Sequence, residues 1–293
     1  MLVKFSCRIP AQLIESAGIA TLPGFLDLAT GHIVSDPKSK MSSASASGVR
    51  RTVEKPVLAG SSGTSYSWAA GRWLPTDWLQ VAPDGLHYAY PEVATPFRLH
   101  VVDLRSGSDR VISSGTVWGI LDYRADGIYL TKTRYNSGES NSGLWRMNPT
   151  TGSLLQLLPE TATTLWLNGQ VAWGSDRAIT ATTLYRYDLK TGARSVWFKP
   201  PGHYVQYIAS DSSGRPLVGV FAMGGPGVLW LLSAPSKGTV ISSSAGGPWY
   251  GSAGPIDSNG TWLSSGSGPW LLRPGGQLIH VTTAPVRALG SCA

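Results

Sequence analysis

The chain has 293 residues, of which 35 are Gly, 20 are Pro, 12 are Trp and 11 are Tyr, and only 14% are charged. This composition is typical of a turn-rich β protein and argues against long amphipathic helices, and no apolar run approaches the ~18 residues of a membrane-spanning helix. The formal net charge is +7, but five bases and one acid between residues 38 and 55 supply +4 of it, so a nucleic-acid-binding groove is not indicated.

The two cysteines, Cys7 and Cys292, lie near opposite ends of the chain. A disulfide between them would close a ring and contribute up to about 5 kcal/mol in the loop-closure model. This pairing predicts an oxidising location, secreted, periplasmic or at the cell surface; two unrelated thiols are the alternative. Pro10 and Glu15 interrupt the apolar part of residues 1–16, so we expect no signal peptide there, and either the signal is absent or the start is internal.

Two hairpins are predicted in the first quarter of the chain, turning at Gly31 in FLDLATGHIV and at Gly71 in SYSWAAGRWLP. Between them, residues 38–63 are Ser-rich and basic and have no hydrophobic period, which predicts a flexible insertion. We assign both hairpins to one N-terminal blade at residues 25–75. Assigning each hairpin to a separate blade is the alternative.

Two series of turns then alternate along the rest of the chain. The first series recurs every 42 to 46 residues at Gly85, Gly127, Gly169, Gly214 and Gly260. The second follows with nearly the same period at Gly107, Gly152, Gly192, Gly238 and Gly276. Two hairpin turns per ~40 residues predict four short antiparallel strands per unit, which is the pattern of propeller blades. Five such blades are predicted at residues 77–113, 117–158, 163–199, 203–243 and 248–283.

The sequence WLQVAPDGLHYAY at residues 78–90 resembles the strand–turn–strand unit of TolB-like propellers, and VVDLRSG, RYDLKTG and LDLATG resemble the outer-hairpin turns of that group. The resemblance implies a propeller, and such proteins act mainly as binding and assembly platforms. Together with the turn series, it leads us to expect an all-β fold, with residues 1–293 forming one β-propeller closed near the termini. Six four-stranded blades are predicted, with seven as the alternative.

The predicted first strands all open with an aromatic residue. These residues are Trp78, Trp118, Trp166, Tyr204 and Trp249. Since first strands line the central channel, the pattern predicts an aromatic collar at the channel mouth, joined by His203 and Tyr250 and suited to stacking against a ligand. Rings wedged between blades as part of the core are the alternative.

The longest polar loop within the five later blades spans residues 131–143 and should lie on the same face as the collar. Its tip would carry Arg134, Tyr135 and Glu139. Loops on a rigid scaffold often carry recognition residues, and a solvated loop without function is the alternative.

Catalytic patterns are weak. The five histidines show no metal-ligand spacing, no GxSxG elbow follows a strand, and we expect no metal or cofactor. The leading hypothesis is therefore a non-catalytic, extracytoplasmic and monomeric propeller that binds a protein, peptide or glycan. The rival is a lyase, lactonase or glycosidase acting at the channel mouth with His203 and nearby carboxylates.

Overall fold

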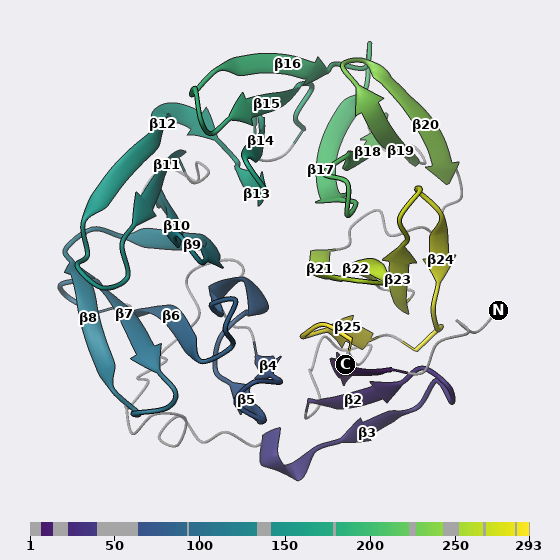
Figure 1. Ribbon diagram of the computed structural model, residues 1–293. Coiled ribbons are helices and arrows are strands. Elements are labelled where there is room, and N and C mark those ends of the chain that lie inside the picture. The colour runs from purple at the N-terminus through teal and green to yellow at the C-terminus, as the bar shows by residue number, and fades with distance from the viewer. Residues whose placement is uncertain are drawn as a thin grey trace.

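The computed structural model describes residues 7–13, 23–39, 64–92, 94–133, 142–177, 180–222, 227–242, 252–265, 268–284 and 286–292. In these residues the strands form small antiparallel sheets arranged in a ring, which Figure 1 shows along its axis. Five sheets have four strands, a sixth has three, and a single additional hairpin forms a two-stranded sheet. For the described part of the chain, the expectation of a six-bladed all-β propeller is therefore confirmed.

The closing blade joins both ends of the chain in the order β25-β1-β2-β3. Its strands are β25 (Val286–Ala288), β1 (Arg8–Leu13), β2 (Gly24–Asp27) and β3 (Ile33–Ser35), and the short helix η1 (Pro37–Ser39) follows β3. The three-stranded blade contains β6 (His87–Glu92), β7 (Arg98–Asp103) and β8 (Asp109–Ser114).

The other four blades each contain four consecutive strands. The first two are β9 (Trp118–Arg124), β10 (Gly127–Lys132), β11 (Ser142–Met147) and β12 (Leu154–Thr163), then β13 (Trp166–Asn168), β14 (Val171–Ser175), β15 (Leu184–Asp188) and β16 (Arg194–Phe198). The last two are β17 (Tyr204–Ser210), β18 (Pro216–Phe221), β19 (Gly227–Ala234) and β20 (Lys237–Ser242), then β21 (Ser252–Asp257), β22 (Gly260–Ser265), β23 (Gly268–Leu272) and β24 (Leu278–His280). In these four blades the first strand lies nearest the centre and the fourth on the rim (Figure 1).

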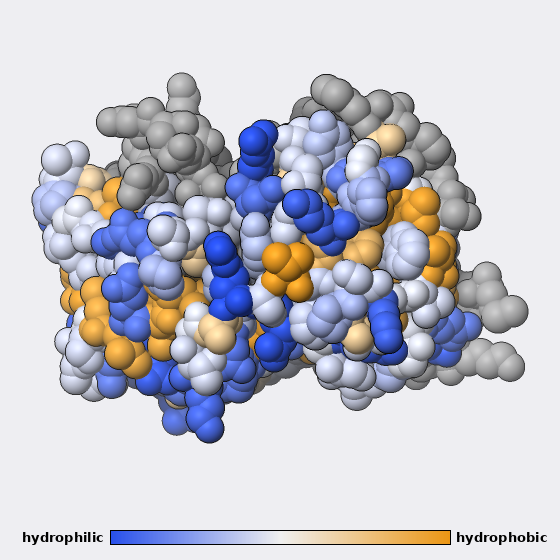
Figure 2. Space-filling model, turned by 90° about the horizontal axis from the view of Figure 1, so that it is seen from above, coloured by the Kyte–Doolittle hydropathy of each residue, from blue (hydrophilic) through white to orange (hydrophobic). Residues whose placement is uncertain are grey.

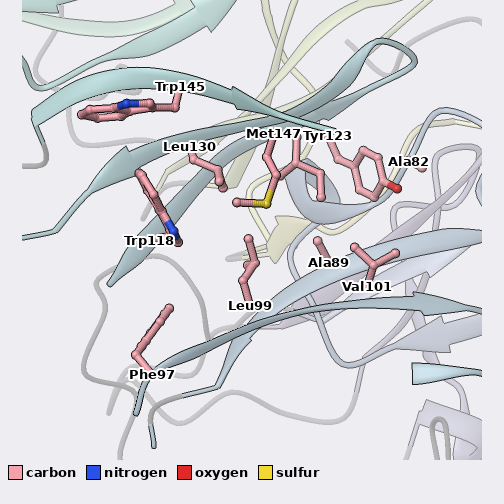
Figure 3. Close-up of a cluster of buried hydrophobic side chains, with 11 residues drawn as sticks. Ala82, Ala89, Phe97, Leu99, Val101, Trp118, Tyr123, Leu130, Trp145 and Met147 are labelled. Carbon is pink, nitrogen blue, oxygen red and sulfur yellow. The ribbon is translucent and has the colours of Figure 1, made fainter. Parts of the chain in front are cut away.

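The alternation of side chains along the strands builds the core between blades. Leu99 and Val101 of β7 share one face of their sheet, and Leu130 of β10 and Met147 of β11 belong to the same buried cluster. Figure 3 shows the side chains of this cluster converging from the two blades. Burying each such side chain contributes roughly 1.5–3 kcal/mol, so the blades are held together by their facing surfaces.

The turns follow the predicted series, except that three of the named glycines lie in a strand next to the turn: Gly127 and Gly260 begin β10 and β22, and Gly238 is the second residue of β20. Gly152 has a φ of +72°, and a Cβ there would lie 2.4 Å from the carbonyl oxygen of Ile112, so both conformation and space require glycine. The prediction of a turn at Gly238 is wrong, because Gly238 lies within β20. Ser236 instead adopts the left-handed conformation, with a φ of +57°.

The ring closes where the predicted cysteine pair lies. β1 pairs with β2 on one side and with β25 on the other, with Ala11 opposite Ala288. Cys7 and Cys292 form a disulfide with their Cα atoms 5.7 Å apart. The predicted disulfide and closure near the termini are therefore present.

The prediction of one N-terminal blade built from both hairpins is wrong. The hairpin β2–β3 shares a sheet with β1 and β25, whereas β4 (Ser65–Ser67) and β5 (Arg72–Leu74) form a two-stranded sheet. This second hairpin lies between the closing blade and β6–β8: Trp73 packs against Phe25, and Leu74 packs against Tyr88. Because β1 and β25 complete the closing blade, that sheet has no place for β4–β5.

Two further predictions in the N-terminal half concern the strand at Trp78 and the basic insertion. The strand expected at Trp78 is a short helix, η2 (Trp78–Gln80), because an Asp77 carboxylate oxygen accepts a hydrogen bond from the Leu79 N–H at 3.1 Å. Only Val81 bridges to β6. Most of the expected insertion, residues 40–63, lies outside the described residues. The helices in the described chain have three residues each, far too few for a membrane crossing.

Candidate functional site

The collar residues Trp118 and Trp166 pack against other aromatic rings. Trp118 is 2% exposed, packs edge-on against Trp145 with ring centroids 5.3 Å apart, and donates its indole N–H to the Ser113 hydroxyl. Trp166 is half-buried and stacks on Tyr207 of the next blade at 5.1 Å. Trp118 therefore serves the core, and Trp166 also packs between blades.

The remaining collar and loop residues divide into two groups. Tyr204 opens β17 and is half-buried, with its ring 5.8 Å from that of Phe221. Five other predicted site residues lie outside the described residues. They are Arg134, Tyr135, Glu139, Trp249 and Tyr250.

A pocket of about 420 Å³ lies between the blades β13–β16 and β17–β20. Its first wall comes from the end of β16 and the link to β17, which supply Phe198, Pro200 and His203. Of the predicted site residues that the structure describes, His203 alone lies in this pocket.

The second wall comes from the blade β17–β20. Val220 and Ala222 lie at the end of β18 and just after it, Val228 and Trp230 lie on β19, and Val240 lies on β20. The spacing of two within the first two pairs places each pair on one face of its sheet. The lining thus extends from the link before β17 across β18 and β19 to the rim strands β16 and β20.

The pocket is continuous with the core below it. The rings of Phe198 and Trp230 are 6.0 Å apart, and both belong to a cluster that includes buried Tyr207 and Trp173. Burial also raises the pKa of Tyr207. Figure 2 looks onto the rim around β16 and shows hydrophobic surface in small groups among hydrophilic residues. The pocket is therefore an extension of the apolar core to the surface.

His203 has a defined orientation in the pocket wall. Its Nδ1 donates a hydrogen bond to the Pro201 carbonyl at 2.7 Å, which leaves Nε2 as the nitrogen that can meet a ligand. Pro200 and Pro201 restrict φ in the link, and the His203 N–H also contacts the Pro200 carbonyl at 3.4 Å. The polar group of the pocket is thus held before any ligand arrives.

The chemistry available at His203 is that of a hydrogen-bonding group in an apolar wall. Among the described residues, no three His, Cys, Asp or Glu side chains are grouped so that they could hold a metal ion. The only acid between Asp188 and Asp257 in the sequence is Asp211, which lies at the opposite end of β17 from His203. The arrangement is suited to binding an apolar group and orienting it through one polar contact.

Sequence reasoning missed most of this pocket. It selected residues at the start of first strands, whereas the walls come from a second, a third and two fourth strands. The alternation in VGVFA and GVLW could have indicated shared faces, but only the packing of two blades shows that these faces meet beside the end of β16.

No protein-family model and no curated protein matches the chain. Among solved structures, TolB from Acinetobacter baumannii is 14% identical with a TM-score of 0.47, and the match covers 93% of this chain and 65% of that one. An oligogalacturonate lyase in complex with manganese is 12% identical with a TM-score of 0.47, and the match covers 69% of this chain and 63% of that one. An acylaminoacyl peptidase from Pyrococcus horikoshii is 12% identical with a TM-score of 0.47, and the match covers 74% of this chain and 39% of that one.

This chain therefore spans less than two thirds of the length of these three proteins. At such identities the likeness concerns the fold and assigns no activity, ligand or partner. TolB structures are among those to which this propeller is similar.

Proposed function

We propose that this propeller is a non-catalytic, monomeric binding protein that takes an apolar group of a protein, peptide or glycan into the pocket between β13–β16 and β17–β20. The pocket itself carries the proposal. Its volume of about 420 Å³ lies within the ~300–1,000 Å³ typical of ligand sites, and among the described residues that line it only His203 is polar. Val240, 45% exposed, extends this apolar surface to the rim.

The surroundings of His203 favour binding over catalysis. A general acid–base pair would place a carboxylate near the imidazole. Within the described residues, Nδ1 of His203 instead contacts a backbone carbonyl, and Asp211 is engaged by Arg215 at 2.7 Å. These contacts support a positioning role for the imidazole rather than proton transfer.

We also propose an extracytoplasmic location. The disulfide between Cys7 and Cys292 supports it, because such bonds persist in oxidising compartments. Titration of thiols in the denatured protein, isolated from its own compartment, checks this proposal. A result of fewer than one reactive thiol per chain would agree with an extracytoplasmic location. Two reactive thiols per chain would contradict it.

Binding screens with peptides and glycans test the pocket, using two matched variants. Val240→Asn places an amide in the pocket wall, whereas Val196→Asn changes another exposed valine, on β16, outside the pocket. Ligands of the wild type should bind Val240→Asn about fivefold or more weakly and Val196→Asn unchanged. A screen without binders, or binders that tolerate both changes equally, would contradict the proposed function.

A further inference from the structure

We propose that the apolar group bound in this pocket is a neutral aromatic ring that carries a hydrogen-bond donor, as the side chain of Trp or Tyr does in a peptide. The inference rests on the proposed function and names the chemical class of its ligand. The donor would meet Nε2 of His203, and the ring would lie against Phe198 and Trp230.

The proton on the His203 ring decides which partner the pocket can take. The Pro201 carbonyl only accepts hydrogen bonds, so the His203 Nδ1 that lies 2.7 Å from it carries the proton. In the neutral imidazole the second nitrogen, Nε2, is then an acceptor. Nε2 has no partner among the described residues. A ligand group that meets this nitrogen therefore has to donate the hydrogen bond.

The pocket walls disfavour a charged ligand. Among the described residues that line the walls, none is Lys, Arg, Asp or Glu. A charged group that leaves water for such walls loses its hydration without gaining an opposite charge. An ammonium group could donate to Nε2, but the described lining offers it no carboxylate. A neutral N–H or O–H group makes the hydrogen bond with a smaller loss of hydration, so we infer a neutral donor.

Two aromatic side chains favour a ring over an aliphatic chain. Phe198 lies in one wall and Trp230 in the other, with ring centroids 6.0 Å apart and planes tilted by 41°. Aromatic rings prefer edge-to-face or offset contacts with one another, with centroids about 4.5–7 Å apart. A ligand ring placed against both walls would make two such contacts, which an aliphatic chain cannot make.

Matched pairs of uncharged probes test the donor. N-acetyl-tryptophanamide is compared with its 3-benzothienylalanine analogue, in which sulfur replaces the indole N–H, and N-acetyl-tyrosinamide is compared with N-acetyl-phenylalaninamide. Binding is measured by ligand-observed NMR at about pH 8, where an ordinary imidazole is neutral. The probe with the donor should bind about fivefold more tightly than its partner in each pair. Val240→Asn should weaken the binding of all the probes.

Histidine variants give the control. His203→Phe removes the acceptor and keeps an apolar wall, so it should abolish the preference within each pair. It should still bind the benzothienyl probe, which shows that the pocket remains folded. His32→Phe changes an exposed histidine in the turn between β2 and β3 of the closing blade and should keep the preference.

The outcomes separate this inference from the proposed function. Equal affinities within each pair, with all the probes weakened by Val240→Asn, would overturn the donor and leave the proposed function standing. A preference that survives in His203→Phe would also overturn the inference alone, because the donor would then meet another group. If no probe bound in a way that depends on Val240, both the inference and the proposed function would be overturned.

Discussion

At the scale of single residues, a polar cluster stands out on the blade β6–β8. His100 is 8% exposed, its Nδ1 lies 2.9 Å from Asp109 and its Nε2 lies 3.2 Å from Glu92. Tyr90 stacks on the His100 ring and donates its hydroxyl to Asp109 at 2.7 Å. The cluster connects all three strands through side chains, on the face turned away from the core shown in Figure 3.

His100→Leu should destabilise the protein by about 3 kcal/mol, because it leaves two carboxylates without the imidazole between them. His87→Leu is the matched control, since the pair of His87 with Asp84 is exposed and should be worth less than about 1 kcal/mol. Urea unfolding of both variants measures the difference. Equal losses would show that the cluster adds nothing to stability.

A buried carboxyl gives a prediction with a pH dependence. Burial raises the pKa of Asp77 above its usual 3.8, and the hydrogen bond from Leu79 and the charge of Arg287 oppose this rise only in part. A raised folded-state pKa means that stability falls as pH increases from 3.8 through that pKa. Asp77→Asn retains the helix cap and should gain stability relative to wild type over this range.

The measurement for Asp77 is the free energy of unfolding of both proteins at acid and neutral pH. The advantage of Asp77→Asn should be larger at neutral pH. If the stability of Asp77→Asn relative to wild type decreased as the pH increased, the folded protein would favour the charged carboxylate, which would contradict the prediction.

At the scale of elements, the local signals succeed and the non-local ones fail. The two turn series could be predicted because a tight hairpin needs particular residues at particular places. The strands that pair with the N-terminal hairpins could not be predicted, because the pairing of Ala11 with Ala288 joins strands from opposite ends of the chain. The sequence RIPAQL of β1 does alternate, with Ile9, Ala11 and Leu13 at every second position, but this alternation does not identify the strands with which β1 pairs.

The closing blade predicts a large effect of the disulfide. The double variant Cys7→Ser with Cys292→Ser should lose about 2–5 kcal/mol, since the bond restricts an unfolded chain over a separation of 285 residues. Urea unfolding under oxidising and reducing conditions measures this loss. Reductant should bring the wild type to the stability of the double variant and leave that variant unchanged; a wild type indifferent to reductant would contradict the prediction.

At the scale of the whole molecule, the ring brings together surfaces that no single repeat contains. Of the aromatic residues expected to open first strands, Trp118 and Trp166 pack between blades, and among the described site residues only His203 lies in the pocket. The pocket is formed by the mutual position of two blades, so a one-dimensional period can count the blades without locating the space between them.

A crystal structure of the protein soaked with N-acetyl-tryptophanamide tests the central claim most directly. The claim predicts the indole in the pocket between Phe198 and Trp230. The ligand bound among the first strands near Trp166 and Tyr204, with the pocket between β13–β16 and β17–β20 empty, would contradict it.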